Sequence, residues 1–383
     1  MENLKVKKDW EIKKLGDVCE IYQPQTISTK QLIENGKYSV YGANGIIGNY
    51  DKYNHEESEV LLTCRGATCG SVNISEPFSW INGNAMVIHP KSTDISKQFL
   101  TFILCSLDYS HIITGAAQPQ ITRQTLSPTL IPVPPLEEQK RIVKILDEKF
   151  AQLETIKTNA QTNLQNANDL FQSQLTKAFS NTTWEKKRLG DVCEIRPSKS
   201  ETTKYLSDDD NVSFLPMEDL QIMNYYIEPK QSKRLKEVSG SYTCFANGDV
   251  LLAKVTPCFE NGKQGIAKDL ENGVGFGSSE YIVFRPPTEL LSEYLYYSLA
   301  TSDFRENGKK HLLGACGLKR LSKDYVNEYE IPLPPLPEQK RIVKELDALS
   351  EKVRQLQEIY TKQIANCDEL KQAYLQKAFE GEL

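Results

Sequence analysis

The sequence is poor in the residues that build metal sites and disulfide frameworks. Its 383 residues include only four histidines, and none of the nine cysteines is placed as Cys-x-x-Cys. A zinc module needs clustered thiolates and imidazoles, so we expect no metal site. The odd number of cysteines favours free thiols in a reducing compartment, the cytoplasm, used mainly as small core residues. Cys19 and Cys193 are the clearest candidates for such core thiols.

Long apolar runs are also missing. The longest, near Phe99–Leu107, is too short to span a bilayer. The N-terminal segment MENLKVKKDWEIKKLG has no apolar core of a secretion signal. We therefore expect a cytoplasmic protein with no membrane partner.

The motifs of common catalytic sites are absent as well. The sequence has no G-x-x-x-x-G-K-[ST] loop of an ATP motor. It has no glycine-rich cofactor loop followed by N/D-P-P-Y/F, and no evident nuclease constellation. These absences predict a chain with no catalytic residues and no cofactor of its own.

Neither sign of charge dominates the sequence. Lys and Arg number 46 and Asp and Glu number 51, so the formal net charge is −5. DNA-binding proteins are usually basic, because Lys and Arg neutralise phosphates. A DNA-binding role thus requires cations gathered on one face, or partner subunits that supply part of the phosphate contact. An adaptor that binds proteins is the alternative that the charge favours.

An internal duplication is the strongest pattern in the sequence. WEIKKLGDVCEI (10–21) matches WEKKRLGDVCEI (184–195) at ten of twelve positions. IPVPPLEEQKRIVKILD (131–147) matches IPLPPLPEQKRIVKELD (331–347) at fourteen of seventeen. The segments between the blocks, about 22–130 and 196–330, barely match. Two equal frames around unlike segments suggest one molecule that recognises two different targets in one geometry.

A helical pattern follows each proline block. Apolar residues recur mostly at spacings of three and four from Ile142 to Ala178 and from Ile342 to Ala378, with no proline. Narrow stripes of this kind are typical of coiled coils. We predict two long helices, at 142–180 and 342–383, that pack on each other antiparallel.

The variable segments mix strand and helix signals. Short β-type runs occur at Glu59–Thr63, Ala85–His89, Asp249–Ala253 and Glu280–Arg285, and helical candidates at Ser96–Leu107 and Glu289–Ser298. The predicted fold class is α+β, with two pseudo-symmetric α/β globular domains separated by the two helices.

The sequence resembles the specificity subunits of type I restriction–modification systems over essentially its whole length. The resemblance is carried by both repeated blocks and by RGATCGSV (65–72), GAAQPQI (115–121), GDVLLAKVTPCFENGK (248–263) and GFGSSEYIVFRP (275–286). One departure is GACGLKRLS (314–322), which stands where the first half has GAAQPQITR. This departure argues against transferring the residues of that loop one by one.

The resemblance implies a non-catalytic scaffold subunit that recognises DNA. Target recognition domains at 1–141 and 181–341 would each bind one half of a bipartite, asymmetric site on double-stranded DNA. The helices at 142–180 and 342–383 would set the spacing and bind two methyltransferase subunits, and two restriction/translocase subunits would join for cleavage. The methyl donor and ATP would then belong to the partners. A subunit of a methyltransferase-only or fused type II-like system is an alternative, as is the coiled-coil adaptor.

Polar loop residues are the candidates for DNA contact in the first half. Arg and Gln side chains suit the edges of guanine and adenine. The candidates are Arg65, Gln118, Gln120, Thr122 and Arg123. Arg65 is equally well explained as a turn-stabilising residue, and Thr122 as a helix N-cap.

The candidates in the second half lie on a strand–turn segment and in basic clusters. They are Lys254, Asn261, Lys263, Gln264, Ser278, Ser279, Lys309, Lys310, Lys319 and Arg320. We expect a hairpin with its turn at Asn261-Gly262 and its tip on DNA. For the clusters, a solvated surface is the alternative.

The repeated E-Q-K-R sequence at the start of each helix is the candidate partner surface. Its residues are Glu138, Gln139, Lys140 and Arg141 in one copy, and Glu338, Gln339, Lys340 and Arg341 in the other. Two equal blocks favour a partner that binds twice. Helix initiation is the alternative, because acidic residues and a preceding proline suit a first helical turn.

Overall fold

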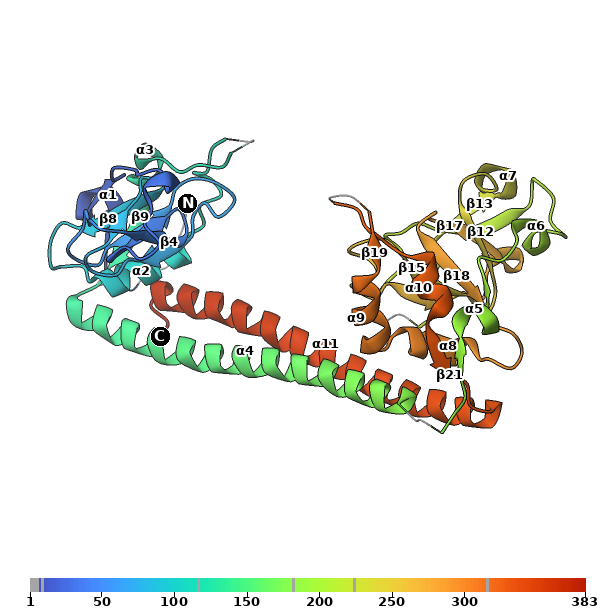
Figure 1. Ribbon diagram of the computed structural model, residues 1–383. Coiled ribbons are helices and arrows are strands. Elements are labelled where there is room, and N and C mark those ends of the chain that lie inside the picture. The colour runs from blue at the N-terminus through green and yellow to red at the C-terminus, as the bar shows by residue number, and fades with distance from the viewer. Residues whose placement is uncertain (1–6, 8–9, 116–117, 181–182, 223–224, 315–316) are drawn as a thin grey trace. The chain divides into compact units, whose positions relative to one another are not determined.

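Figure 1 shows the computed structural model, which describes residues 7, 10–115, 118–180, 183–222, 225–314 and 317–383. The chain divides into two compact units, residues 1–161 with 361–383 and residues 162–360. We call these unit 1 and unit 2. Each unit holds one globular domain, one part of the first long helix and one part of the second.

The two long helices are α4 (Leu136–Phe179) and α11 (Leu336–Glu380). Both start six residues before the positions expected from the sequence, 142 and 342, so the predicted starts are too late. The carbonyls of Pro135 and Pro335 accept hydrogen bonds from amides of the first helical turn. The helix therefore begins right after each proline pair, where proline is tolerated because early helical amides have no partner within the helix.

The long helices run antiparallel within unit 1. The first part of α4 packs on the last turns of α11, and an ion pair of 2.7 Å joins Lys157 to Asp368 beside this seam. The buried residues of the seam are Ile142, Leu146, Leu375, Ala378 and Phe379.

The same antiparallel pairing recurs within unit 2. The amide of Gln357 donates to the Asn168 side chain at 2.6 Å. The buried residues of this seam are Ala167, Phe171, Leu175, Ile342, Leu346 and Val353. The antiparallel coiled coil predicted from the apolar stripes is confirmed in both units (Figure 1).

The domain of unit 1 is built on two sheets and a short ladder. The four-stranded sheet has the order β2-β8-β5-β6, the three-stranded sheet has the order β4-β3-β7, and β1 pairs with β9. The strands are β1 (Glu11–Lys14), β2 (Cys19–Tyr22), β3 (Tyr38–Gly42), β4 (Gly45–Tyr50), β5 (Val60–Thr63), β6 (Val72–Ile74), β7 (Trp80–Ile81), β8 (Ala85–Pro90) and β9 (Leu130–Val133). The helices are α1 (Leu15–Val18), η1 (Thr29–Gln31), α2 (Lys97–Ser106) and α3 (Arg123–Leu126).

The domain of unit 2 repeats this plan with larger insertions. Its four-stranded sheets have the orders β11-β18-β15-β16 and β13-β12-β17-β14, and β10–β21 and β19–β20 form two-stranded ladders. The strands are β10 (Lys186–Arg188), β11 (Glu194–Ile195), β12 (Asn211–Leu215), β13 (Gln231–Arg234), β14 (Thr243–Ala246), β15 (Val250–Ala253), β16 (Gln264–Ile266), β17 (Val274–Gly277), β18 (Tyr281–Arg285), β19 (Leu312–Leu313), β20 (Arg320–Leu321) and β21 (Glu330–Pro332). The helices are α5 (Leu189–Val192), α6 (Lys199–Thr202), α7 (Leu235–Val238), η2 (Glu271–Gly273), α8 (Ser292–Leu299), α9 (Ser302–Lys310) and α10 (Lys323–Glu328).

The α+β class and the main predicted elements are confirmed. The four β-type runs correspond to β5, β8, β15 and β18, and the two helical candidates correspond to α2 and α8. Cys19 and Cys193 are buried as expected, and burial raises the pKa of each thiol to about 12.

The expected Asn261-Gly262 hairpin turn is wrong in its details. β15 pairs with β16, but residues 254–263 connect them as a ten-residue loop with its own turns. Gly262 has a φ of 74°, and a Cβ atom there would meet the Arg305 guanidinium at 2.4 Å. Glycine suits this position because of its positive φ and the close approach of the Arg305 side chain from α9, and not because of a tight two-residue turn.

Candidate nucleic-acid interface

The β2-β8-β5-β6 and β11-β18-β15-β16 sheets have the same strand order and the same register. In β5, Val60 lies opposite Ile88 and Ile74. In β15, Val250 lies opposite Phe284 and Ile266. Positions of one domain can therefore be assigned to positions of the other by backbone pairing, although the sequences here barely match.

A buried carboxylate occupies the same position ahead of β5 and β15. Glu59 is 4% exposed and bonds to His89 at 2.9 Å, and Asp249 is 1% exposed and bonds to Arg285 at 2.8 Å. His89 and Arg285 are equivalent, because they lie opposite Glu20 and Glu194 in the paired edge strands. Since each carboxylate bonds to a side chain of the neighbouring strand, we infer that these pairs stabilise the sheet and do not contact a ligand.

Two chain segments cross at the end of β5 in unit 1 and at the end of β15 in unit 2. In unit 1, Gly66 N–H donates to Pro119 O at 3.0 Å, and Ile121 N–H donates to Cys64 O at 3.0 Å. We call this crossing of residues 64–66 with 118–123 clasp 1. Its backbone bridge pairs Arg65 with Gln120.

Unit 2 contains the same crossing. Thr256 N–H donates to Lys319 O at 2.9 Å, and Leu321 N–H donates to Lys254 O at 2.8 Å. We call this crossing of residues 254–256 with 318–321 clasp 2. The segments GAAQPQITR and GACGLKRLS, which seemed too different to align, therefore place Gln120 and Arg320 at the same position.

Clasp 1 presents uncompensated polar side chains to solvent. Arg65, Gln118, Gln120 and Arg123 are all exposed. Among the residues that the structure describes, neither Arg65 nor Arg123 has a carboxylate within ion-pair distance. Thr122 differs, because its hydroxyl accepts from Thr125 N–H at 3.2 Å and caps α3. The N-cap given as the alternative for Thr122 is therefore present, and a DNA contact by this side chain stays a prediction.

Clasp 2 presents a charged triad instead. Arg320 donates to the carboxylate of Glu280 through Nε at 2.9 Å and through Nη2 at 2.8 Å. Lys254 Nζ lies 3.8 Å from the same carboxylate and donates to Ser279 O at 2.8 Å. The hydrogen bonds from Arg320 lower the pKa of Glu280, and burial lowers the pKa of Lys254. The triad carries a net charge of about +1.

The backbone pairing also identifies the residue of unit 1 that is equivalent to Glu280, which sequence reasoning missed. Lys254 N–H donates to Glu280 O, and Cys64 N–H donates to Asn84 O. Asn84 and Glu280 therefore occupy the same position below the two clasps. Only the register of the sheets reveals this, because NGNAM and SSEYI share no motif.

The remaining candidates of unit 2 divide into exposed and engaged residues. Gln264 is 1% exposed and its amide donates to Tyr296 O, so the prediction that it contacts DNA is wrong. Lys263 donates to Met217 O, and Lys309 pairs with Glu306. Exposed side chains at the surface of this domain are Asn261, Ser279, Lys309, Lys310 and Lys319, whereas Ser278 is half-buried.

The repeated glutamine of the helix start is buried in both units. Gln139 and Gln339 are each 0% exposed. Gln139 accepts from Ser96 N–H at 3.0 Å and donates to Asp94 O at 2.7 Å and to Pro134 O at 2.9 Å. Its side chain ties the first turn of α4 to the chain ahead of α2. Gln139 and Gln339 are therefore removed from the predicted partner surface, because their polar atoms are used inside the domain.

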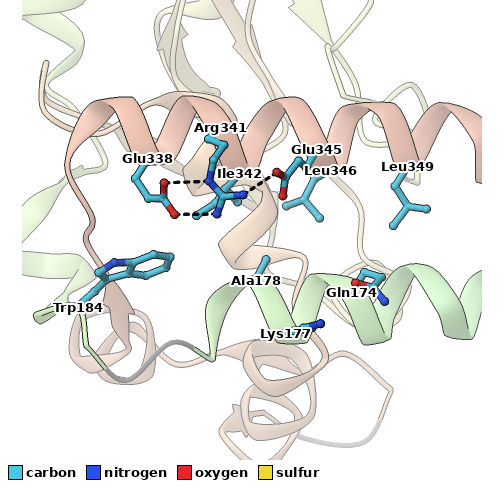
Figure 2. A pocket seen from close by; sticks show the side chains of 10 residues that line it. All are labelled: Gln174, Lys177, Ala178, Trp184, Glu338, Arg341, Ile342, Glu345, Leu346 and Leu349. Atoms are coloured by element: carbon cyan, nitrogen blue, oxygen red, sulfur yellow. Dashed lines mark hydrogen bonds and ion pairs between the residues drawn. The ribbon is translucent and has the colours of Figure 1, made fainter.

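The charged residues beside these glutamines lie at the surface. Glu138 bonds Arg141 at 2.7 Å, and Glu338 bonds Arg341 at 2.7 Å, both as i,i+3 pairs on their own helices. In unit 2, Glu338 and Arg341 border a cavity of about 370 Å³ between the end of α4 and the start of α11 (Figure 2). Trp184 closes one side of it. Lys140 and Lys340 are exposed.

Comparison with known proteins assigns the family. Residues 7–164 and 181–364 match the Type I restriction modification DNA specificity domain. The chain belongs to this family. It carries two copies of the domain, one for each half of the duplication, and clasp 1 and clasp 2 lie at equivalent positions within them.

Relatives of the specificity family differ in how much of their length is matched. The EcoAI specificity subunit of Escherichia coli is 34% identical over 194 residues, which cover 50% of this chain and 30% of that protein. A putative type I restriction enzyme specificity subunit of Haemophilus influenzae is 25% identical over 364 residues, which cover 91% and 89%. The alignments with the E. coli EcoAI and EcoEI subunits span only 30% and 26% of those proteins.

Solved structures share the fold. A chain from a study of complex assembly and conformational transition of the type I R-M system superposes with a TM-score of 0.74 at 22% identity, covering 100% of both chains. The HsdS subunit from Thermoanaerobacter tengcongensis superposes with a TM-score of 0.53 at 21% identity, covering 99% and 98%. The two-domain architecture of this specificity-family chain is thus a known arrangement.

Two further features are absent from the part of the chain that the structure describes. None of its helices has the length and apolar character that a bilayer crossing requires. No group of three or more His, Cys, Asp or Glu side chains is placed to hold a metal ion among these residues.

Proposed function

We propose that this chain is the DNA sequence-recognition and scaffold subunit of a type I restriction–modification complex. Each domain recognises one half of a bipartite, asymmetric site on double-stranded DNA. The observation that carries the proposal is the pair of clasps. They share one backbone arrangement, in which Arg65 lies opposite Gln120 in one unit and Val255 lies opposite Arg320 in the other, so equivalent positions carry different side chains. Sequence-specific recognition depends on such side chains at base edges, while the backbone frame fixes their position.

The remaining parts of the proposal follow from the family. The chain itself performs no catalysis and binds no cofactor, and two methyltransferase subunits supply the methyl donor. Two restriction/translocase subunits join for cleavage and supply ATP use. The antiparallel helices hold the domains at the spacing of the two half-sites. Because the complex acts on cellular DNA, we place it in the cytoplasm.

The net charge of −5 is compatible with this role. Arg65 and Arg123 are exposed in clasp 1, and Lys319 is exposed in clasp 2. These cations supply local positive potential at the proposed contact sites. The methyltransferase subunits supply the rest of the phosphate contact, so affinity for DNA should depend on assembly.

Selection from a library of randomised duplexes tests the proposal. The chain, copurified with its methyltransferase subunit, should enrich two fixed blocks of unlike sequence separated by a spacer of no fixed sequence. The methyltransferase alone should enrich neither block. A single continuous motif, two identical blocks, or no enrichment by the assembled complex would contradict the proposal.

The partner surface gives a second testable prediction. Lys140→Glu together with Lys340→Glu should weaken assembly with the methyltransferase more than either change alone. We expect about 1 kcal/mol for each site, the typical contribution of an exposed interface charge. Arg141 and Arg341 are left intact, because each donates two hydrogen bonds to a glutamate of its own helix, whereas Lys140 donates one, to Glu137. Mass photometry over a concentration series measures the dissociation.

The matched control is Lys352→Glu, which reverses an exposed charge of α11 away from the repeated block. It should leave assembly unchanged. If the double variant assembles as well as the unaltered chain, the two lysines belong to a solvated surface and the partner docks elsewhere.

A further inference from the structure

The Arg320 side chain is held in a defined orientation. Its Nε and Nη2 atoms both donate to the carboxylate of Glu280, at 2.9 and 2.8 Å. A guanidinium group has five donors in a rigid planar fork, so this bond uses one edge and leaves the edge formed by Nη1 and Nη2 free. The Arg320 side chain is 47% exposed, whereas that of Glu280 is 21% exposed.

We propose that Arg320 recognises a guanine in the half-site of the second domain, and that Glu280 is its positioning residue. The inference rests on the proposed function. Guanine presents two adjacent acceptors, O6 and N7, in the major groove, and the terminal edge of an arginine matches them with two parallel hydrogen bonds. An orientation fixed in advance also reduces the conformational entropy lost on binding.

Lys254 also holds the backbone at Glu280 in place, through two hydrogen bonds. Lys254 donates to Ser279 O at 2.8 Å, which anchors the backbone immediately before Glu280. Lys254 N–H also donates to Glu280 O at 2.9 Å. The backbone that carries the Glu280 side chain is therefore held by clasp 2 independently of the contact with Arg320.

The carboxylate beside Arg320 argues against a phosphate contact by this side chain. Its guanidinium is already compensated by a carboxylate, and a phosphate approaching Arg320 would also approach the partly exposed Glu280. Like charges repel, so an arginine paired in this way is better suited to neutral acceptors such as guanine O6 and N7.

The equivalent position in unit 1 has different chemistry. Gln120 stands in place of Arg320, and Asn84 stands in place of Glu280. A glutamine amide has one donor group and one acceptor, the pattern that matches adenine N6 and N7 rather than guanine. The two clasps thus differ at the position that meets the base edge, which would make the two half-sites unlike each other.

The test uses the full chain in complex with its methyltransferase subunit and a randomised duplex library. The unaltered complex should select an invariant guanine at one position of one half-site. Arg320→Gln should reduce the preference for that guanine by roughly 10- to 100-fold and leave the other half-site unchanged. Arg320→Lys should not restore it, because an ammonium group lacks the planar pair of donors.

Glu280→Gln separates base recognition from phosphate binding. It removes a negative charge beside Arg320, so a phosphate contact predicts tighter binding to every sequence. A positioning role predicts instead a weaker preference for the one guanine, without a uniform gain. Arg188→Gln breaks an exposed ion pair of 3.0 Å with Glu328 in the same domain and is the control. It should change no base preference.

A modified duplex tests the contact without altering the protein's fold. Replacing the selected guanine by 7-deazaguanine removes the N7 acceptor. It should weaken binding of the unaltered complex but cause no further loss in the Arg320→Gln complex. Additive losses, an equal change for all sequences, or a selected second half-site without guanine would overturn the inference. If the unaltered complex selects no bipartite motif at all, the proposed function fails instead.

Discussion

Replacing Gln339 by alanine is expected to destabilise unit 2 by about 3 kcal/mol. The side chain is fully buried, accepts from Leu291 N–H at 2.9 Å, and donates to Glu289 O and Pro334 O at 2.8 Å each. Alanine leaves these three backbone groups, one buried and two partly buried, without the amide. Each unsatisfied group costs about 1–3 kcal/mol, and water entering the vacated space recovers part of the total.

Chemical denaturation measures this loss, and hydrogen exchange locates it. The amide of Leu291 should lose protection in Gln339→Ala, and the amide of Ser96 should do so in Gln139→Ala, because Gln139 has the equivalent bonds in unit 1. Gln355→Ala is the matched control. Gln355 is exposed and bonds only the neighbouring Glu351 of its own helix among the described residues, so we expect less than about 0.5 kcal/mol.

A small loss would change the interpretation of the repeated glutamine. If Gln339→Ala lost less than about 1 kcal/mol and Leu291 stayed protected, the side chain would be dispensable for the fold. Its presence in both repeated blocks would then need another explanation.

Replacing residues 196–329 by the corresponding segment of another specificity-family member is expected to change one half of the recognised site completely. The first half should stay the same. The segment begins after β11 and ends before β21, so the β10–β21 ladder and the start of α11 are retained. The two domains have separate cores, which is why their recognition should be independent. Selection from the duplex library measures both halves at once.

The reciprocal replacement of residues 23–129 is the control and should change only the other half. In the replacement of residues 196–329, the donor segment must supply aromatic residues at the positions of Tyr294 and Tyr297, because Tyr294 packs on Phe179 and Tyr297 donates to Asp347 at 2.7 Å. If either replacement altered both half-sites in a folded, assembled complex, the domains would not recognise DNA independently.

The sequence by itself determined the architecture. The duplication, the two helical stripes and the β-type runs are local or periodic signals, and backbone geometry converts such periods directly into helices and strands. The apolar stripe from Ile142 to Ala178 needs a partner of the same kind, and the second stripe supplies it. The family resemblance could be identified for the same reason, because it rests on contiguous blocks.

The tertiary structure alone decided which candidate side chains are available. Gln139 belongs to a charged block whose composition predicts a surface position, yet its side chain is buried. Ser96 and Asp94, more than 40 residues earlier in the chain, bond to it. Gln264 looks like a loop residue, but the long connection from β15 makes it the first residue of β16 and buries it. Burial of a polar residue depends on partners distant in sequence, which periodicity does not encode.

The equivalence of the two clasps also required the structure. Arg320 meets Glu280 across 40 residues of sequence, and no motif links them. The register of β15 with β18 brings these segments together, and the same register in unit 1 brings Asn84 below Gln120. Side chains that define specificity vary while the frame persists. The pairing of backbone strands therefore shows which side chains of the two domains are equivalent. Strand register is fixed by backbone hydrogen bonds and by the buried face of the sheet, and not by the exposed side chains at its end.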